Sequence, residues 1–357
     1  MKPYKIRLSL LFFILYLLFF LPKSYAQNHR LWSKEKANLW YEKQPWPRGC
    51  NYIPSSAVNQ LEMWQADTFD PKTIDRELGW AESIGFNTVR VFLHHLAWEE
   101  DPTGFTKRVN QYLTIAHKHG IATIFVIFDD CWNPTYKAGK QPEPKAGIHN
   151  SGWVRDPGDL LFEDHKLNGI LEKYVKTILR TFGKDKRVFA WDLYNEPGNS
   201  GYGIKCLPLL KKVYAWASQV NPSQPLTSGV WSQVKEVSNF QIGNSDIISY
   251  HNYSNDTLQL KAIASFRTYR RPLICTEYMA RKLGSRFDNV MPVLKAGKVG
   301  AINWGLVSGK TNTIYAWNEP ITDGSEPKLW FHDIFRKDGT PYKQDEVNLI
   351  KKLTDKE

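Results

Sequence analysis

Short apolar runs alternate with amphipathic segments along almost the whole chain, and this alternation restricts the fold more than any other feature. Apolar runs without polar alternation are typical of strands buried on both faces of a sheet. Eight runs are predicted as strands: 49–53, 87–93, 121–128, 188–194, 226–231, 246–251, 272–277 and 299–304. Because strands that alternate with helices form parallel sheets, eight such units in about 300 residues predict an α/β fold, a single (β/α)8 TIM barrel.

The segments between these runs carry helix signals. Asp70 and Pro71 suit an N-cap and a first helical position, and Gly85 ends that segment. An open doubly wound sheet with a nucleotide site is the alternative, but no Gly-x-Gly-x-x-Gly motif follows the first strand and no linker divides the chain. Helices are expected at about 71–84, 106–119, 167–182, 207–220, 234–240, 258–269, 287–296 and 345–353.

The N-terminus has the composition of a secretory signal peptide. Residues 1–7 carry three basic side chains, 8–21 are almost wholly apolar, and Ser24-Tyr25-Ala26 has the form of a cleavage site. A membrane anchor is the alternative, but an apolar run of about 14 residues is shorter than the ~20 that span a bilayer. We therefore expect a signal peptide at 1–26, a secreted or periplasmic barrel at 27–357, and no stable membrane insertion after cleavage.

Charge and cysteine content restrict the partners and cofactors. The net charge of +11 falls to about +7 without the leader, and the remaining Lys and Arg are scattered, so no nucleic-acid partner is expected. No CxxC pair occurs, so structural zinc is not expected, and His94, His95 and Asp130 lack the spacing of metal ligands. Few groups could bind phosphate or a nicotinamide, so neither a metal nor a cofactor is expected. Cys50 and Cys275 are predicted to be buried free thiols, whereas a Cys131–Cys206 disulfide between two loops stays open.

Polar residues gather at the ends of the expected strands, where barrel active sites lie. Glu196 follows the fourth strand and Glu277 ends the seventh, so a barrel brings both carboxylates to its mouth. Two carboxylates in unequal environments can divide nucleophilic attack and proton donation, which is the chemistry of glycosidic bonds. For one such glutamate alone, the alternative is a structural ion pair, for example with Arg90.

Several motifs together resemble the clan A retaining glycoside hydrolases, which carry catalytic glutamates on strands 4 and 7 and include the family 5 cellulases and mannanases and the family 2 glycosidases. Asn195-Glu196-Pro197 matches the strand 4 motif, and Glu277 matches the strand 7 glutamate. Arg90, His251-Asn252-Tyr253 and Trp304 match the clan's residues on strands 2, 6 and 8. The resemblance covers essentially the whole mature chain. The histidine pair expected on strand 3 in family 5 follows strand 2 here, as His94-His95.

The resemblance implies that Glu196 is the general acid/base and Glu277 the nucleophile. Tyr253 and Arg90 would hold Glu277 and keep it ionised. A retaining mechanism requires carboxyl groups about 5–5.5 Å apart, and we expect this separation together with a raised pKa for Glu196.

Substrate contacts are expected around this pair. By the same resemblance, Asn195 would bind the sugar 2-hydroxyl, His251 would contact substrate or the acid/base, and Trp304 would form a platform. Position and residue type alone add Trp132, Trp231 and Asp130 as further candidates, with rim packing and loop capping as the alternatives.

The leading prediction is a secreted retaining β-glycoside hydrolase whose partner is its carbohydrate substrate, a polysaccharide or an oligosaccharide. The alternatives are a transglycosidase on the same barrel and a carbohydrate-binding barrel without catalysis. The long segment 129–164, rich in Pro, Gly and Trp, is expected to decide the sugar, the linkage and the choice of endo or exo action. The segment 311–317 is a second candidate for shaping a subsite.

Overall fold

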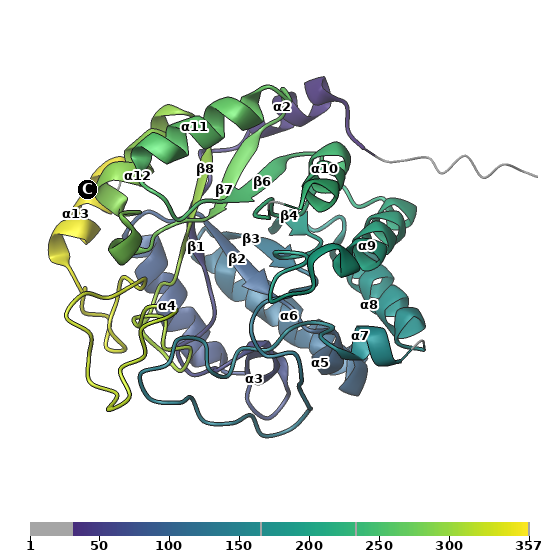
Figure 1. Ribbon diagram of the computed structural model, residues 1–357, viewed down its shortest axis with the longest axis horizontal. Coiled ribbons are helices and arrows are strands. Elements are labelled where there is room, and N and C mark those ends of the chain that lie inside the picture. The colour runs from purple at the N-terminus through teal and green to yellow at the C-terminus, as the bar shows by residue number, and fades with distance from the viewer. Residues whose placement is uncertain (1–30, 165, 233, 356–357) are drawn as a thin grey trace, which may run out of the picture. The chain divides into compact units, whose positions relative to one another are not determined.

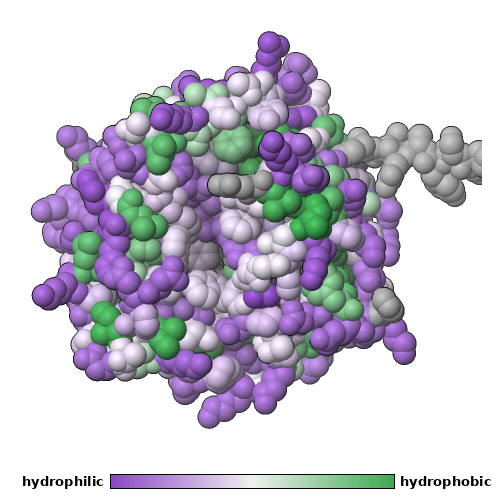
Figure 2. All heavy atoms as spheres, in the orientation of Figure 1, coloured by the Kyte–Doolittle hydropathy of each residue, from purple (hydrophilic) through white to green (hydrophobic). Residues whose placement is uncertain are grey.

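The computed structural model describes residues 31–164, 166–232 and 234–355 of the chain. The predicted signal peptide at 1–26 lies outside the described residues. Among the helices that are described, none combines the length and the apolar character needed to cross a membrane. Hydrophilic side chains cover most of the face seen in Figure 2, and the hydrophobic ones there form small separate groups.

Eight parallel strands form one sheet, in the order β5-β4-β3-β2-β1-β8-β7-β6. An isolated parallel bridge between Val230 and Tyr250 joins β5 and β6, the two ends of this sheet, so the barrel is nearly closed (Figure 1). This confirms the predicted (β/α)8 fold. The strands are β1 (Arg48–Asn51), β2 (Thr88–Phe92), β3 (Ala122–Val126), β4 (Val188–Asp192), β5 (Leu226–Thr227), β6 (Ile248–His251), β7 (Leu273–Glu277) and β8 (Gly300–Trp304).

Helices surround the sheet and connect successive strands (Figure 1). Asp70 caps α4 by accepting a 3.0 Å hydrogen bond from the Thr73 amide, as its position before Pro71 predicts. The helices are α2 (Lys34–Glu42), α3 (Gln60–Trp64), α4 (Pro71–Ser83), α5 (His95–Glu100), α6 (Pro102–Lys118), α7 (Leu160–Glu163), α8 (Leu167–Phe182), α9 (Leu207–Val220), α10 (Lys235–Asn244), α11 (Asp256–Arg267), α12 (Phe287–Ala296) and α13 (Gln344–Leu353), with 3-10 turns η1 (Gly203–Cys206) and η2 (Arg281–Leu283).

The barrel has two apolar layers and one closed end. The larger layer lies between the strands and the surrounding helices, where Phe125, Ile178 and Leu210 are completely buried. A smaller cluster of strand residues, including Ile124, Ile274 and Ile302, packs against Trp40 and Tyr41 of α2. Because α2 lies before β1 and packs against residues near the strand starts, it covers the N-terminal end of the barrel and leaves the C-terminal end for the site.

Candidate active site

The ends of β4, β6 and β7 bring three polar side chains together at the C-terminal end of the barrel. A carboxylate oxygen of Glu196, a ring nitrogen of His251 and a carboxylate oxygen of Glu277 all lie within 4.8 Å of one another. The three side chains line one cavity of about 470 Å³. The expected meeting of the two glutamates therefore occurs, although they are far apart in the sequence.

Glu277 is held by a cation and a hydroxyl group. Arg90 Nη1 donates a 2.9 Å hydrogen bond to one carboxylate oxygen, and the Tyr253 hydroxyl donates a 2.8 Å bond to the other. The Arg90 side chain is completely buried, so it positions Glu277 from behind and is not available to a sugar in the cavity. The guanidinium also binds Asp192 in a buried ion pair at 2.8 Å.

Glu196 has a different set of neighbours. His251 Nδ1 lies 2.7 Å from one carboxylate oxygen. The Cys131 thiol donates to the other oxygen at 3.3 Å, and the Asn199 amide donates to the same oxygen. Glu196 adopts a left-handed backbone with φ of 42°, which is uncommon outside glycine and is often found where a functional site fixes the chain. This strained turn directs the carboxyl group into the cavity.

Burial raises the pKa of both glutamates, and it raises the pKa of Glu277 to about 7. The charge of Glu196 adds to the rise in the pKa of Glu277, whereas His251, Arg90 and the Tyr253 hydroxyl oppose it. Arg90 therefore favours the charged form of Glu277 against the effect of burial, although its guanidinium also bonds to Asp192. Two such coupled carboxyl groups titrate as a pair, so the first proton that they bind is shared between them.

Hydrogen bonds fix both the oxygen and the nitrogen of the Asn195 side-chain amide. Its oxygen accepts a 2.6 Å hydrogen bond from Arg90, and its nitrogen donates a 2.8 Å bond to Asp129. Asp129 is completely buried at the end of β3 and also accepts a 2.7 Å bond from the Trp153 indole. Asp129 and Trp153 thus belong to the support of the site rather than to its surface.

The predicted sugar contact of Asp130 is wrong. The Asp130 carboxyl group is completely buried and accepts 2.7 Å hydrogen bonds from the Tyr194 hydroxyl and the Gly198 amide. These bonds direct it toward the turn that follows β4, and it does not line the cavity. Burial raises the pKa of Asp130 to about 8, so this carboxyl group is protonated at neutral pH.

His94 and His95 also lie away from the cavity. Asp156 accepts a 2.7 Å hydrogen bond from the His95 amide and a second from the His95 ring. The His94 ring contacts the Arg155 carbonyl oxygen at 3.1 Å. Among the described residues, His94, His95 and Asp156 form one of two clusters with metal-ligand side chains, and the other is Glu196, His251 and Glu277. Each of these groups already has hydrogen-bond partners within the protein.

Aromatic and amide side chains complete the cavity. Trp132, Trp231 and Trp304 line it as predicted, and so does Trp317 from the segment 311–317. Sequence reasoning missed several loop residues, since loop positions carry no periodic signal that would show which of them face the cavity. They are Cys131, His149, Asn150, Asn199, Ser200 and Asn318. All four cysteines are free thiols, so the Cys131–Cys206 disulfide left open above is not formed.

Several solved structures share this barrel. A GH5_18 protein from Streptomyces cattleya, in complex with Manb1-4GlcNAc, aligns with a TM-score of 0.59 at 13% identity over 86% of this chain and 80% of that one. An exo-beta-1,4-mannosidase from Opitutaceae bacterium strain TAV5 aligns with a TM-score of 0.60 at 18% identity over 87% of this chain and 60% of that one.

An endo-1,4-beta-mannanase from Rhizomucor miehei aligns with a TM-score of 0.55 at 13% identity over 85% of this chain and 94% of that one. No protein-family model matches the sequence, and no curated protein matches it either. At identities this low, the alignments establish a shared architecture. The chain thus has the (β/α)8 barrel fold that these solved structures share.

Proposed function

We propose that the protein is a retaining β-glycoside hydrolase that cleaves O-glycosidic bonds in poly- or oligosaccharides. The observation that carries the proposal is the pair Glu196 and Glu277, which lie within 4.8 Å at the barrel mouth and have different partners. Glycoside hydrolases that retain configuration need carboxyl groups about 5–5.5 Å apart, whereas inverting enzymes need about 6.5–9.5 Å to admit a water molecule. The short separation supports retention.

The hydrogen bonds assign a role to each glutamate. Glu277 accepts from a guanidinium and a hydroxyl group, both of which stabilise its negative charge. Glu196 has no cation within hydrogen-bonding distance among the described residues, since burial lowers the pKa of His251 to about 4 and keeps that ring neutral. The shared proton therefore rests on Glu196, which makes Glu196 the acid and Glu277 the nucleophile.

In the first step, a Glu277 carboxylate oxygen forms a bond to the anomeric carbon while the bond to the leaving oxygen breaks. The Glu196 proton passes to that oxygen, so the leaving sugar departs as a neutral alcohol. The product is an ester between Glu277 and the sugar. Asn195, held by Arg90 and Asp129, is placed to hydrogen-bond the 2-hydroxyl as the charge develops.

In the second step, Glu196 acts as a base because Glu277 no longer carries a charge. It removes a proton from water, the water oxygen attacks the anomeric carbon, and the ester bond to Glu277 breaks. Glu196 is then protonated and Glu277 ionised, as at the start. Two inversions at one carbon give a product with the configuration of the substrate.

The lining of the cavity supports a carbohydrate as the substrate. Four tryptophan rings, one at the end of β8 and three in loops, offer flat apolar surfaces to the faces of sugar rings: Trp304, Trp132, Trp231 and Trp317. Amide groups of Asn195 and Asn199 offer hydrogen bonds to hydroxyl groups. No strong anion-binding group opens into the cavity within the described part of the chain, because Arg90 is buried behind Glu277.

We also propose that the enzyme is exported and acts in a secreted or periplasmic location. The support is the leader sequence at 1–26, with its basic start, apolar run and small-residue cleavage site. N-terminal sequencing of the protein purified from its natural host should begin at Gln27. Recovery of a chain that starts at Met1 would contradict export by signal cleavage.

The proposed roles can be separated with variants of the two glutamates. On 2,4-dinitrophenyl β-glycosides of glucose, mannose and galactose, Glu277→Gln should lose activity by at least about 10⁴-fold, because no covalent intermediate can form. Glu196→Ala should still form the ester between Glu277 and the sugar, because the dinitrophenolate leaving group departs without taking up a proton. Added azide should then restore turnover of Glu196→Ala and give a β-glycosyl azide.

Two results would contradict the proposal. Wild-type activity in the Glu277→Gln variant would show that Glu277 is not the nucleophile. Wild-type protein that hydrolyses none of these glycosides, nor any member of a polysaccharide panel, would exclude the enzymatic function and favour a carbohydrate-binding barrel.

A further inference from the structure

Three loops on one side of the barrel mouth are joined into a single wall, which we define as residues 52–59, 141–154 and 309–321. The loops follow β1, β3 and β8, and the sheet order places β8, β1, β2 and β3 next to one another. In Figure 1 the long loops after β3 and β8 lie side by side, next to α3. The wall therefore stands over the strands on the β8–β3 side of the barrel.

Hydrogen bonds tie the loop after β3 to the loop after β8. The Asn150 amide donates to the Thr311 carbonyl oxygen at 2.8 Å, and the Ile321 amide donates to Gly147 at 3.0 Å. The neutral His149 ring contacts the Tyr315 carbonyl oxygen at 2.8 Å, and burial lowers the pKa of this histidine to about 4. These three contacts join residues 147–150 of one loop to residues 311–321 of the other.

The loop after β1 is bonded to both of the others. The Lys310 amide donates to the Ser55 carbonyl oxygen at 3.1 Å. The Asn59 side chain donates to the Gly152 carbonyl oxygen at 2.9 Å. A β-carbon on Gly309 would lie 2.5 Å from the Ser55 backbone, which shows how closely these two loops approach. The segment after β1 is thus bonded to both of the other segments.

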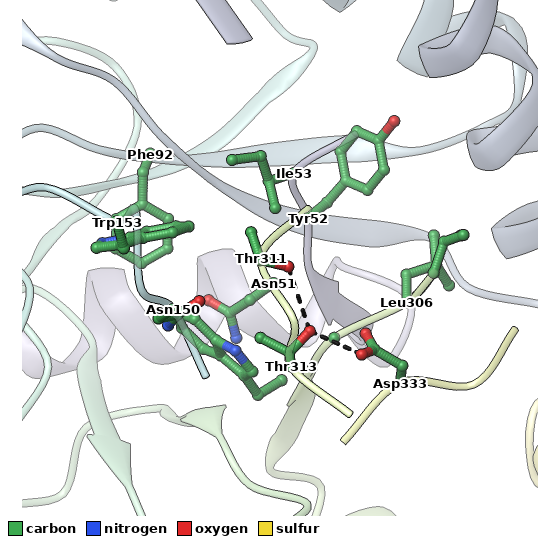
Figure 3. Close-up of a pocket in the computed structure, with 13 residues that line it drawn as sticks. Asn51, Tyr52, Ile53, Phe92, Asn150, Trp153, Leu306, Thr311, Thr313 and Asp333 are labelled. Atoms are coloured by element: carbon green, nitrogen blue, oxygen red, sulfur yellow. Dashed lines mark hydrogen bonds between the residues drawn. The ribbon is translucent and has the colours of Figure 1, made fainter. Parts of the chain in front are cut away.

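The space that remains where the loops meet is too small for a sugar. Figure 3 shows this cavity, with Ile53, Asn150, Trp153 and Thr311 around it and Thr313 hydrogen-bonded to Asp333. Its volume of about 20 Å³ is enough for one water molecule and far too little for a pyranose ring. This cavity therefore gives a glycan chain no passage between the loops.

The two sides of the active-site cavity differ. On the wall side, Trp132, His149 and Trp317 lie against one another, with ring centroids 5.3 and 6.4 Å from that of His149. On the side of the proton donor, Ser200 is exposed and Asn199 and Trp231 are only partly buried. On the wall side the buried His149 fills the space behind the two tryptophans, whereas the side beside Glu196 reaches the surface at Ser200.

We infer, building on the function proposed above, that this enzyme is exo-acting and removes one sugar at a time from the non-reducing end of a β-linked oligosaccharide. The proton donor must lie beside the glycosidic oxygen, so the leaving group extends over the open side, past Ser200 and Trp231. The sugar bonded to Glu277 then faces the wall. Any further sugar on its non-reducing side would collide with Trp132, His149 or Trp317.

Product analysis tests the inference on the full protein. The probes are β-1,4-linked tetrasaccharides of glucose and of mannose with a fluorophore at the reducing end. The first labelled product should be the trisaccharide alone. The same probes with a bulky 4,6-benzylidene group on the non-reducing sugar should not be cleaved. Labelled disaccharide among the first products, or internal cleavage of the blocked probes, would overturn exo action while leaving the glycosidase function intact.

A pair of glycine variants tests whether the wall is the cause. Gly147 has a φ of +67°, and a β-carbon there would lie 1.6 Å from the Ile321 carbonyl oxygen, so Gly147→Ala should force the two loops apart. Gly139→Ala in the same loop is the control, because Gly139 also has a positive φ but nothing lies within 4 Å of its β-carbon position. The ratio of internal to terminal cleavage should rise at least about tenfold in Gly147→Ala and stay unchanged in Gly139→Ala.

An unchanged ratio in folded Gly147→Ala would contradict the role of the wall. Failure of the wild-type protein to cleave any tetrasaccharide or any aryl glycoside would instead contradict the proposed function on which the inference rests. The two failures are therefore distinguishable by whether hydrolysis occurs at all.

Discussion

Arg90 shows how one residue organises the whole site. Its guanidinium is completely buried and donates to Asp192, Asn51, Asn195 and Glu277. A buried guanidinium with carboxylates on two sides is stabilised by charge, and its planar donors fix the directions of its partners. The position of Glu277 and the orientation of Asn195 are therefore set together by a single side chain on β2.

Removal of the Tyr253 hydroxyl should change the pH dependence of the reaction. The hydroxyl donates to Glu277 and favours its charged form, so Tyr253→Phe should raise the pKa of Glu277. Because kcat/KM requires ionised Glu277, its acidic limb should move to higher pH, with a loss of about tenfold or more at the optimum. A pH profile with an unmoved acidic limb would contradict this role of Tyr253.

The Cys131 thiol should lower the pKa of Glu196. It donates to the Glu196 carboxylate at 3.3 Å, and this contact favours the charged form of Glu196. Cys131→Ala should therefore raise the pKa of Glu196 and move the basic limb of kcat/KM to higher pH, by up to about one unit. Cys206→Ala, at a buried thiol outside the cavity, is the control and should leave both limbs in place. A basic limb that moves to lower pH in Cys131→Ala would argue against the contact.

At the residue scale, sequence reasoning found the groups that end strands and missed those that loops supply. Glu196 and Glu277 follow apolar strands, so their place at the barrel mouth could be predicted from periodicity. Asn199 and His149 reach the cavity through loop turns whose path depends on contacts with other loops. Asp130 was misplaced because an aspartate at a strand end can face the cavity or turn back to cap a neighbouring loop, and only packing decides between them.

At the scale of elements, the close approach of β1 and β2 depends on Gly49. A β-carbon there would lie 1.6 Å from the Thr88 carbonyl oxygen. Gly49→Ala should therefore force the two strands apart and lower the free energy of unfolding by about 3 kcal/mol or more. Urea denaturation measures this change. A variant with wild-type stability would show that the strands adjust without cost.

The matched control is Gly169→Ala in α8. Gly169 is exposed near the start of the helix, and nothing lies within 4 Å of its β-carbon position. Alanine has the higher helix propensity, so this variant should gain about 0.5–1 kcal/mol. The two substitutions are chemically identical and should change stability in opposite directions.

The elements themselves were predictable where they are long and regular. All eight strands and the amphipathic helices α4, α6 and α8 follow from apolar periodicity. Short helices such as α3, which has five residues, offer too few turns for a pattern. The strand expected at 226–231 pairs with β4 only at Leu226–Thr227, and beyond it Val230 alone bridges to β6, because the barrel closes there through a single bridge.

At the scale of the whole molecule, the fold carries a buried carboxyl group that should make its stability depend on pH. Glu77 on α4 accepts hydrogen bonds from the Tyr52 hydroxyl and the Ser55 amide, and burial raises its pKa to about 7. The folded protein therefore binds this proton more tightly than the unfolded chain. The contribution of protonated Glu77 to the free energy of unfolding is fully present below pH about 4.5 and is lost as the pH rises to about 7.

Glu77→Gln should remove this dependence. The amide oxygen of the introduced glutamine side chain can accept the same two hydrogen bonds, but the side chain never becomes charged. Relative to the wild type, the variant should be more stable at pH 8 than at pH 5, by a difference of a few kcal/mol at most. Urea unfolding at both pH values measures the difference. A stability difference between the two proteins that is the same at both pH values would contradict the proposed titration of Glu77.

The central claim is that Glu277 attacks the sugar and Glu196 supplies and then removes the proton. Proton NMR of the first sugar released from a β-glycoside, recorded before the anomers equilibrate, tests this claim most directly. Double displacement through Glu277 predicts that the β-anomer appears first and the α-anomer only later by mutarotation. Initial release of the α-anomer would mean a single inversion by water, and it would contradict the nucleophilic role of Glu277.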